Sequence, residues 1–193
     1  MGARSNIVII GIVIVAMILG AYFLKRSPPG GGLLVDKRFE DLVSNAKPEL
    51  AIKVDAVNAN GQFLAEYTCD GRDKTPSIRV SNIPRGVKTL ALILYDPDAL
   101  RGTFIHWLAL LPVGEDEAVI PSTGLIEGVN DFREIGYSGP CPPRGDKAHR
   151  YFFLILALDN SPTLKSGFTL KELLDNIKGH VIAYGYTMGT YSR

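Results

Sequence analysis

The side chains with the clearest chemical potential in this sequence are two histidines that stand next to loop-forming segments. His149 follows the segment 136–145, which contains three Gly and three Pro, and Tyr151 lies two positions further along. Pro fixes φ and lacks an N–H donor, whereas Gly permits backbone conformations that are closed to other residues. The segment is therefore predicted to be a shaped loop that places a His and a Tyr at the edge of a strand. Its free backbone N–H groups could line a site for an anion.

The second histidine, His106, follows two carboxylates. Asp96 and Asp98 end one apolar stretch and His106 begins the next, so a tight connection would bring a carboxylate close to the imidazole. Such a neighbour favours the imidazolium form and fixes the orientation of the ring. Two histidines of this kind at one pocket would suit a phosphate or another anion. The alternative is that the two aspartates only form a turn and that His106 is a hydrogen-bonded residue at a strand edge.

Other chemistries have weaker support in the sequence. Two His and an Asp could bind a metal ion, but the chain has no His-x-x-x-His or similar spacing. A Gly-x-Ser-x-Gly elbow, which would indicate a Ser-His-Asp hydrolase, is also absent. We therefore expect a binding protein without a metal site or a cofactor, and not an enzyme.

The elements that must position these residues are short β-strands. Apolar or alternating stretches bounded by turn residues predict strands at 50–57, 63–68, 77–80, 89–95, 105–111, 150–158 and 180–188. The continuous apolar run at 152–158 is typical of a strand that is buried on both faces. Strands that are separated by turns instead of helices favour an all-β sandwich over a fold of alternating strands and helices.

One helix is clearly marked in the sequence. Thr169 and Glu172 form the pattern of a capping box, with Thr as the N-cap, and Gly179 supplies the end of the helix. Residues 39–46 could form a second short helix or belong to a tether. The sequence thus predicts a mainly β domain with one or two short peripheral helices.

The composition limits the class of protein. The chain has 193 residues, a formal net charge of +1 and 46% hydrophobic residues, which permits one domain with a sizeable core. A nearly neutral chain gives no support to nucleic-acid binding, which usually shows a basic patch. The two cysteines do not form a Cys-x-x-Cys pair, so the motif of a zinc site or of a thioredoxin-like centre is absent.

An uncharged, apolar run at residues 7–24 precedes the β pattern. A helix of that length nearly spans the ~30 Å hydrocarbon core, so we predict a transmembrane helix that acts as a signal anchor. A cleaved signal peptide and a buried globular helix are the alternatives. We therefore divide the chain into an anchor at 1–26, a Pro- and Gly-rich linker at 27–47 and the β domain at 48–193. Basic residues after the run favour a cytoplasmic domain, although large domains can cross the membrane regardless of charge.

Taken together, several motifs resemble those of the phosphatidylethanolamine-binding protein family, in its bacterial and archaeal branch. They are Asp96–Ala99, His106–Trp107, the loop Gly136–Gly145 and His149–Tyr151, and Cys69–Gly71 fits the same pattern. The resemblance covers residues 50–193 and implies a Greek-key β-sandwich with an anion pocket near one end. The ligand-binding residues that it implies are Asp96, Asp98, His106, Tyr137, Gly139, Cys141, His149 and Tyr151.

The resemblance and the apolar run at 7–24 together indicate two kinds of function. The first is a membrane-anchored binding module whose pocket takes a small anionic ligand, such as phosphate or a phospholipid head group. The alternative is an inhibitor of a serine protease or a carboxypeptidase, for which the segments 113–131 and 160–168 are the candidates for a protruding loop. Leu100 stands where the family usually has Pro, so the loop after Asp98 is expected to differ in shape.

The resemblance also places the loops of Cys69 and Cys141 at the same end of the sandwich. We hypothesise that the two residues form a disulfide, which requires Cα atoms within ~7 Å of each other. Two reduced thiols packed as small hydrophobic groups are the alternative. A disulfide persists in oxidising compartments, so it would favour an extracytoplasmic domain in this single-pass membrane protein, against the charge pattern. The cytosol of some hyperthermophiles is an exception to this rule.

Overall fold

The most continuous apolar runs of the sequence form the middle of the larger sheet. In the computed structural model, which describes residues 36–113, 118–121 and 123–193, β3 (Thr89–Asp96) is buried at every position. Its neighbour β7 (His149–Leu158) is buried everywhere except at Arg150. The two strands pair in an antiparallel arrangement. Strands that are covered on both faces need apolar side chains in both directions, which explains the runs.

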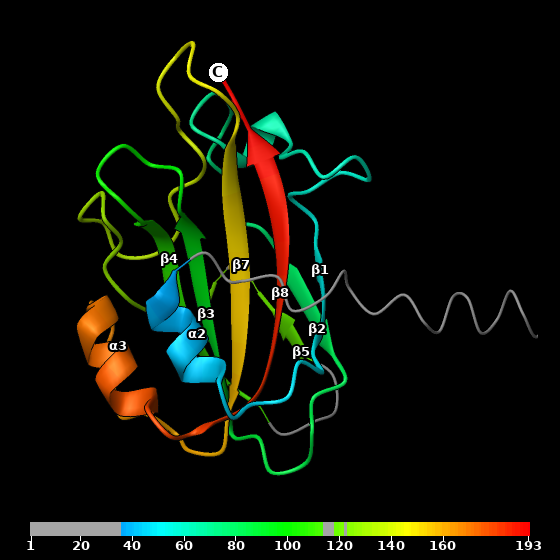
Figure 1. Cartoon of the computed structure of the whole chain (residues 1–193), viewed down its shortest axis with the longest axis vertical. Helices are drawn as coiled ribbons and strands as arrows, with labels where there is room; N and C mark the ends of the chain where they lie inside the picture. The colour runs from blue at the N-terminus through cyan, green and yellow to red at the C-terminus, as the bar shows by residue number, and fades with distance from the viewer. Residues whose placement is uncertain (1–35, 114–117, 122) are drawn as a thin grey trace, which may run out of the picture. The chain divides into compact units, whose positions relative to one another are not determined.

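Two antiparallel sheets make up the domain. The larger has the strand order β6-β4-β3-β7-β8, and its remaining strands are β4 (Phe104–Pro112), β6 (Ile126–Glu127) and β8 (Val181–Tyr191). The smaller has the order β1-β2-β5, with strands at Ala51–Val54, Ile78–Ser81 and Ala118–Ile120. In Figure 1 the smaller sheet lies behind the larger one. The mainly β, two-sheet architecture predicted from the sequence is thereby confirmed.

Alternate side chains of the central strands face two different layers. The even-numbered residues 90–94 of β3 belong to the core between the two sheets. On the opposite face, Tyr95 stacks on Phe152 of β7 with 5.3 Å between the ring centroids. Helix α2 (Lys37–Val43) covers this second face, where the Phe39 ring lies 4.8 Å from that of Tyr95. The larger sheet is therefore covered on both sides, by the smaller sheet and by helix.

Both helices considered in the sequence are present. Helix α3 spans Leu170–Ile177, and its capping box is complete, because the side chains of Thr169 and Glu172 each accept from the other's backbone N–H. Helix α2 shows that the segment left open between helix and tether folds onto the sheet. The compact unit accordingly spans Val35–Arg193, whereas the sequence suggested a start near Pro48.

The transmembrane helix predicted at residues 7–24 lies outside the described residues. None of the helices in the described part of the chain is long and apolar enough to cross a membrane. The anchor and its orientation therefore stay predictions.

The strand predicted at 63–68 is wrong, because Ala65–Tyr67 form a short 3₁₀-helix, η1. Thr68 closes this turn: its backbone N–H and its side-chain hydroxyl both donate to the carbonyl of Ala65, at 3.1 and 2.9 Å. A turn that satisfies its own backbone groups has none left for a sheet ladder. Strands β5 and β6 are not among the predicted strands, since two or three residues carry too little periodicity to be recognised.

Candidate functional site

A cavity of about 260 Å³ opens where β3 ends and β7 begins. Its polar lining comes from Asp96 at the end of β3, His106 near the start of β4, and His149 and Tyr151 at the start of β7. Its apolar lining includes Ala99, Leu100, Phe104, Phe132, Pro142 and Pro143. Antiparallel pairing brings the end of β3 next to the start of β7. The fold thus gathers on one cavity four predicted site residues that come from three strands.

His149 is held between two carboxylates. Its Nδ1 lies 2.7 Å from Asp96 Oδ2, and its Nε2 lies 3.3 Å from Asp146 Oδ2. Burial lowers the pKa of His149, but its hydrogen bonds with Asp96 and Asp146 outweigh this effect, so the pKa is raised overall. Both ring nitrogens face acceptors, and only the imidazolium form can donate to both. The two contacts therefore favour the imidazolium form of His149, whose side chain lines the cavity.

Asp98 does not line the cavity. Its two carboxylate oxygens accept hydrogen bonds from the guanidinium of Arg150, each at 2.8 Å, and Oδ2 also accepts from the Arg150 backbone N–H. This bidentate pairing lowers the pKa of Asp98 to about 2. The backbone N–H of Asp98 donates in turn to Asp96 Oδ1 at 2.7 Å. Asp98 therefore positions the loop after β3 and, with it, the Asp96 carboxylate.

His106 differs from the imidazolium that the sequence suggested. The residue is 2% exposed, and its Nδ1 lies 2.7 Å from the backbone carbonyl of Ser138, which can only accept. Burial lowers the pKa of His106, and this effect exceeds those of the Ser138 hydrogen bond and of the Asp96 charge. The ring is therefore neutral at physiological pH, with Nε2 as its acceptor nitrogen. The carboxylate expected beside His106 is found beside His149 instead.

The hydroxyl of Tyr151 has no hydrogen-bond partner among the described residues, although the side chain is fully buried. Burial and the charge of Asp96 raise the pKa of this phenol, so it is protonated at neutral pH. The Tyr151 ring lies 5.2 Å from His106, and Phe104 and Phe132 continue this aromatic wall at 5.1 and 5.5 Å from His106. An unsatisfied buried hydroxyl costs about 1–3 kcal/mol, so the Tyr151 hydroxyl, on a residue that lines the cavity, is a candidate for a ligand contact.

The loop 136–145 is shaped by residues that lie outside the cavity lining. Asn130 is buried, and its side chain donates two hydrogen bonds to the loop and accepts two from the backbone next to it. Gly139 packs so closely that a Cβ there would lie 2.2 Å from the carbonyl oxygen of Tyr67. The hydroxyl of Tyr137 donates to the same carbonyl. Tyr137 and Gly139, which the resemblance placed among the binding residues, therefore shape the wall and do not line the cavity.

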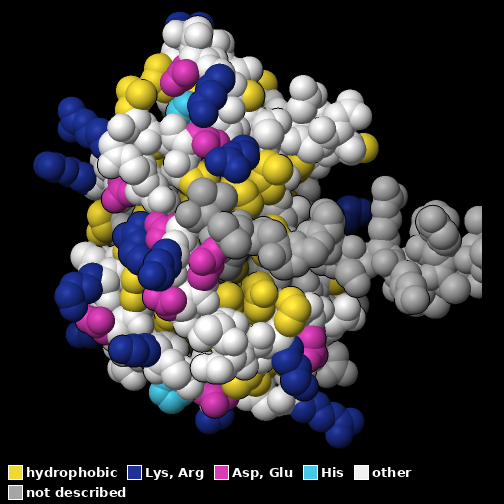
Figure 2. Space-filling view, in the orientation of Figure 1, with side chains coloured by type: hydrophobic (Ala, Val, Ile, Leu, Met, Phe, Trp, Pro, Cys, Tyr) yellow, Lys and Arg dark blue, Asp and Glu magenta, His cyan; other side chains and the backbone are white. Residues whose placement is uncertain are grey.

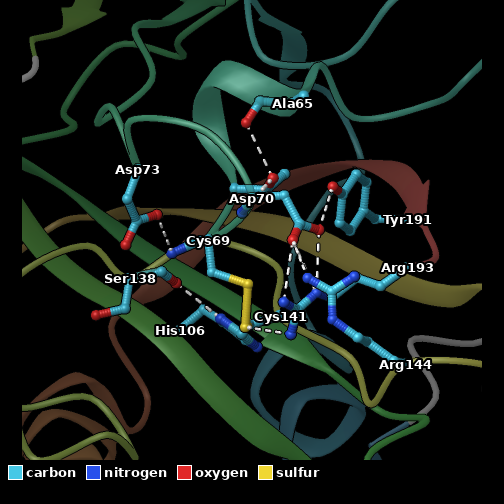
Figure 3. The surroundings of a disulfide bond; sticks show 12 residues. Ala65, Cys69, Asp70, Asp73, His106, Ser138, Cys141, Arg144, Tyr191 and Arg193 are labelled. Atoms are coloured by element: carbon cyan, nitrogen blue, oxygen red, sulfur yellow. Dashed lines mark hydrogen bonds and ion pairs between the residues drawn. A yellow bond between two sulfur atoms is a disulfide. The ribbon is translucent and has the colours of Figure 1, made fainter.

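The predicted disulfide between Cys69 and Cys141 is present, with Cα atoms 5.4 Å apart, and Cys141 lines the cavity. Figure 3 shows the network around it, in which Asp70 accepts hydrogen bonds from the side chains of Tyr191 and Arg193. Arg193 also donates to the Sγ atom of Cys141 at 3.3 Å. The disulfide and this network tie the cavity wall to the carboxyl end of β8, at the same end of the sheet as the loop that leads into β7 (Figure 1).

Sequence reasoning did not identify the aromatic wall or the second carboxylate at His149. Phe104 lies two residues before His106, and Asp146 lies three residues before His149, so nearness in sequence to a histidine was the available signal for these two, whereas Phe132 lies far from both histidines in the sequence. An aromatic residue at the start of a strand looks like a core residue, and an aspartate in a Gly/Pro-rich loop looks like a turn residue. Only the folded chain shows that they face a cavity and an imidazole.

Two further observations bear on other functions. The described residues include no group of three or more His, Cys, Asp or Glu side chains that could hold a metal ion. On the face shown in Figure 2, the described Lys and Arg side chains are interspersed with Asp and Glu and form no continuous basic stripe. The protease-inhibitor alternative stays a prediction, since residues 114–117 and 122 of one candidate loop lie outside the described residues.

Comparison with known proteins identifies relatives of the whole β domain. Residues 54–192 match the family model described as phosphatidylethanolamine-binding protein. A UPF0098 protein of Pyrococcus horikoshii is 42% identical over 161 residues, covering 78% of this chain and 81% of the relative. A UPF0098 protein of Aquifex aeolicus is 41% identical over 143 residues, covering 69% of this chain and 84% of the relative.

Solved structures show the same similarity. A crystal structure from Chlamydia trachomatis, described as a homologue of phosphatidylethanolamine-binding protein, has a TM-score of 0.68 and 33% identity, and covers 76% of this chain and 99% of that one. Escherichia coli YbcL, described as a new member of the mammalian family, has a TM-score of 0.66 and 27% identity, and covers 75% of this chain and 99% of that one. The similarity therefore extends over nearly all of the solved domains.

Proposed function

Because the chain belongs to the phosphatidylethanolamine-binding protein family and has its ligand-binding fold, we propose that its cavity takes a small molecule with a phosphate or carboxylate group, such as a phospholipid head group. The observation that carries the proposal is the convergence of Asp96, His149 and Tyr151 on one cavity whose other walls are mostly apolar. Ligand pockets in proteins typically combine an apolar lining with a few polar groups that fix the orientation of the ligand.

The polar groups of the cavity suit an oxyanion. The imidazolium of His149 supplies positive charge, and the Tyr151 hydroxyl can donate a hydrogen bond. Arg101 lines the rim and is exposed, so its guanidinium can approach an anion at the mouth of the cavity. The neutral His106 offers an acceptor nitrogen to a protonated oxygen or to an ammonium group of the ligand. The Phe104 and Phe132 rings provide a surface for an apolar part of the same molecule.

We propose binding and not catalysis. In the described site neither histidine hydrogen-bonds to the side chain of a Ser, Cys or Lys that it could activate as a nucleophile. His106 contacts a backbone carbonyl, and His149 contacts two carboxylates, none of which is a hydroxyl, thiol or amine nucleophile. Such histidines position charge and hydrogen bonds, and this role suits recognition of a ligand.

We also propose that residues 7–24 anchor the protein in a membrane and that the β domain lies outside the cytoplasm. The apolar run supports the first part because of its length. The disulfide between Cys69 and Cys141 supports the second part, because such bonds persist in oxidising compartments.

Calorimetric titration of the purified full chain with inorganic phosphate, phosphorylethanolamine and acetate tests the binding proposal. We expect saturable binding of at least one of the phosphorylated probes. A lipid head group as the natural ligand predicts tighter binding of phosphorylethanolamine than of phosphate, whereas equal affinities indicate recognition of the phosphate alone. If none of the three probes binds and mass spectrometry finds no small molecule that co-purifies with the protein, the proposed function is wrong.

A further inference from the structure

Few side chains at the inner end of the cavity can donate a hydrogen bond to an anion. His106 uses its Nδ1–H on the carbonyl of Ser138, and His149 uses its Nδ1–H on Asp96. The donors that remain there are the Tyr151 hydroxyl and the Nε2–H of His149. The availability of this second N–H of His149 therefore affects how well an anion binds there.

Asp146, which does not itself line the cavity, accepts from that N–H in the structure. Its Oδ2 lies 3.3 Å from His149 Nε2, while its Oδ1 accepts a hydrogen bond from the backbone N–H of Lys147 at 2.8 Å. The turn that carries Asp146 is closed by a hydrogen bond from its backbone N–H to the carbonyl of Pro143. Gly145 precedes it with φ at 81°, in the left-handed region that favours glycine. The local backbone therefore holds a carboxylate of the chain itself against the imidazolium.

The contact with Asp146 is the weaker of the two that His149 makes. Its distance is 3.3 Å, against 2.7 Å for the contact with Asp96. The side chain of Asp146 is 32% exposed, whereas that of Asp96 is 5% exposed. Water can solvate a partly exposed carboxylate when it leaves its partner, but a buried carboxylate would be left without compensation. A ligand can therefore displace Asp146 and leave Asp96 in place.

We propose that Asp146 is an internal competitor that determines the affinity of the cavity for anions, because it pairs with the His149 N–H that an anionic ligand would need. This inference rests on the proposed function, since it concerns the same site. Binding of an anion then includes the separation of Asp146 from His149, and the free carboxylate repels the incoming charge. Loss of the Asp146 carboxylate should remove both effects and strengthen anion binding. Loss of a ligand-binding residue, in contrast, should weaken it.

The test compares the full chain with Asp146→Asn, Asp146→Ala and the control Asp159→Asn. Asp159 forms a similar pair, with its Oδ1 2.8 Å from His180 Nδ1, but neither residue lines the cavity. Calorimetric titration with inorganic phosphate is run at both pH 5 and pH 6, because loss of Asp146 also removes a hydrogen bond that raises the pKa of His149. We expect both Asp146 variants to bind phosphate about two- to fivefold more tightly, the range for a partly exposed ion pair, and Asp159→Asn to bind like the parent.

The outcomes separate this inference from the proposed function. Unchanged or weaker phosphate binding in both Asp146 variants, with binding retained in the parent chain, overturns the competitor role and leaves the binding function in place. Binding that appears only in the Asp146 variants supports the competitor role strongly. If neither the parent nor the variants bind phosphate, the competitor role is wrong, and the titrations with phosphorylethanolamine and acetate decide the proposed function separately.

Discussion

Asp96 Oδ2 and His149 Nδ1 lie 2.7 Å apart, although 53 residues separate them in the sequence. The contact joins the last residue of β3 to the first residue of β7, and the two residues are only 3% and 2% exposed. Removal of one partner of a buried ion pair strongly destabilises a folded protein, because the other charge is left buried without compensation. The pair therefore fixes the orientation of the imidazolium and depends on the pairing of the two strands.

The first prediction concerns this imidazolium. His149→Ala should weaken phosphate binding about 10- to 100-fold, because a charge-assisted hydrogen bond contributes ~1.5–3 kcal/mol and each 1.4 kcal/mol changes the dissociation constant tenfold. The matched control is His180→Ala, since His180 also pairs with an aspartate but is 46% exposed and lies outside the cavity lining. Calorimetric titration below the unfolding temperature of both variants provides the measurement. Equal losses in the two variants would remove His149 from the site.

The unpartnered hydroxyl of Tyr151 gives a prediction in which stability and affinity separate. Tyr151→Phe should leave the free energy of unfolding unchanged or raise it by up to ~1 kcal/mol, because it removes an unsatisfied polar group, yet it should weaken phosphate binding about fivefold. Tyr95→Phe is the control, because the Tyr95 hydroxyl is also buried without a partner among the described residues but does not line the cavity. Urea denaturation and calorimetry measure the two effects. A binding loss as large in Tyr95→Phe as in Tyr151→Phe would contradict the assignment.

The pair of Asp98 and Arg150 predicts a pH dependence of stability. Arg150 lowers the pKa of Asp98 from its ordinary 3.8 to about 2, so the stabilisation is fully present above pH 4 and is lost as the pH falls towards 2. Asp98→Asn should therefore lower the urea midpoint at pH 5, and its difference from the parent chain should shrink as the pH approaches 2. A difference that stays constant between pH 5 and pH 2 would show that the charge of Asp98 does not stabilise the fold.

The disulfide closes a loop with a sequence separation of 72 residues. In the chain-entropy model its loss should lower the free energy of unfolding by up to ~4 kcal/mol. The double variant Cys69→Ser, Cys141→Ser tests this by urea denaturation, and its phosphate affinity shows whether the bond also holds the cavity wall. Thiol labelling of the denatured protein, trapped at lysis of its native host, gives an independent check. Two reactive thiols before reduction would mean that the bond does not form in the cell.

The apolar run at residues 7–24 leads to a prediction about location. If it anchors the protein, the full chain should sediment with membranes and resist extraction with carbonate. Protease added to intact cells or spheroplasts should digest the β domain if this domain is extracytoplasmic. A soluble full-length chain with an intact N-terminus would rule out the anchor, and a domain protected from protease would place it in the cytoplasm.

Elements whose signal is local could be predicted from the sequence alone. The apolar runs around residues 89–95 and 150–158 predicted the central strands, and Thr169 with Glu172 predicted the start of α3. Periodicity and capping depend on neighbours within a few residues, which a sequence displays directly. The motifs also sufficed to identify the family, because several of them occur in order at matching spacing.

Which of the candidate residues meet depends on the fold of the whole chain. The carboxylate of Asp96 pairs with His149 and not with His106, which is nearer to it in the sequence. The reason is that the β3–β7 pairing places the end of β3 beside the start of β7. His106 is neutral because burial outweighs its hydrogen bond, and burial depends on packing from distant segments. The contact between Asp146 and His149 likewise depends on the turn at Gly145. Strand pairing, burial and loop conformation are properties of the folded chain, so residue types and spacing could not determine them.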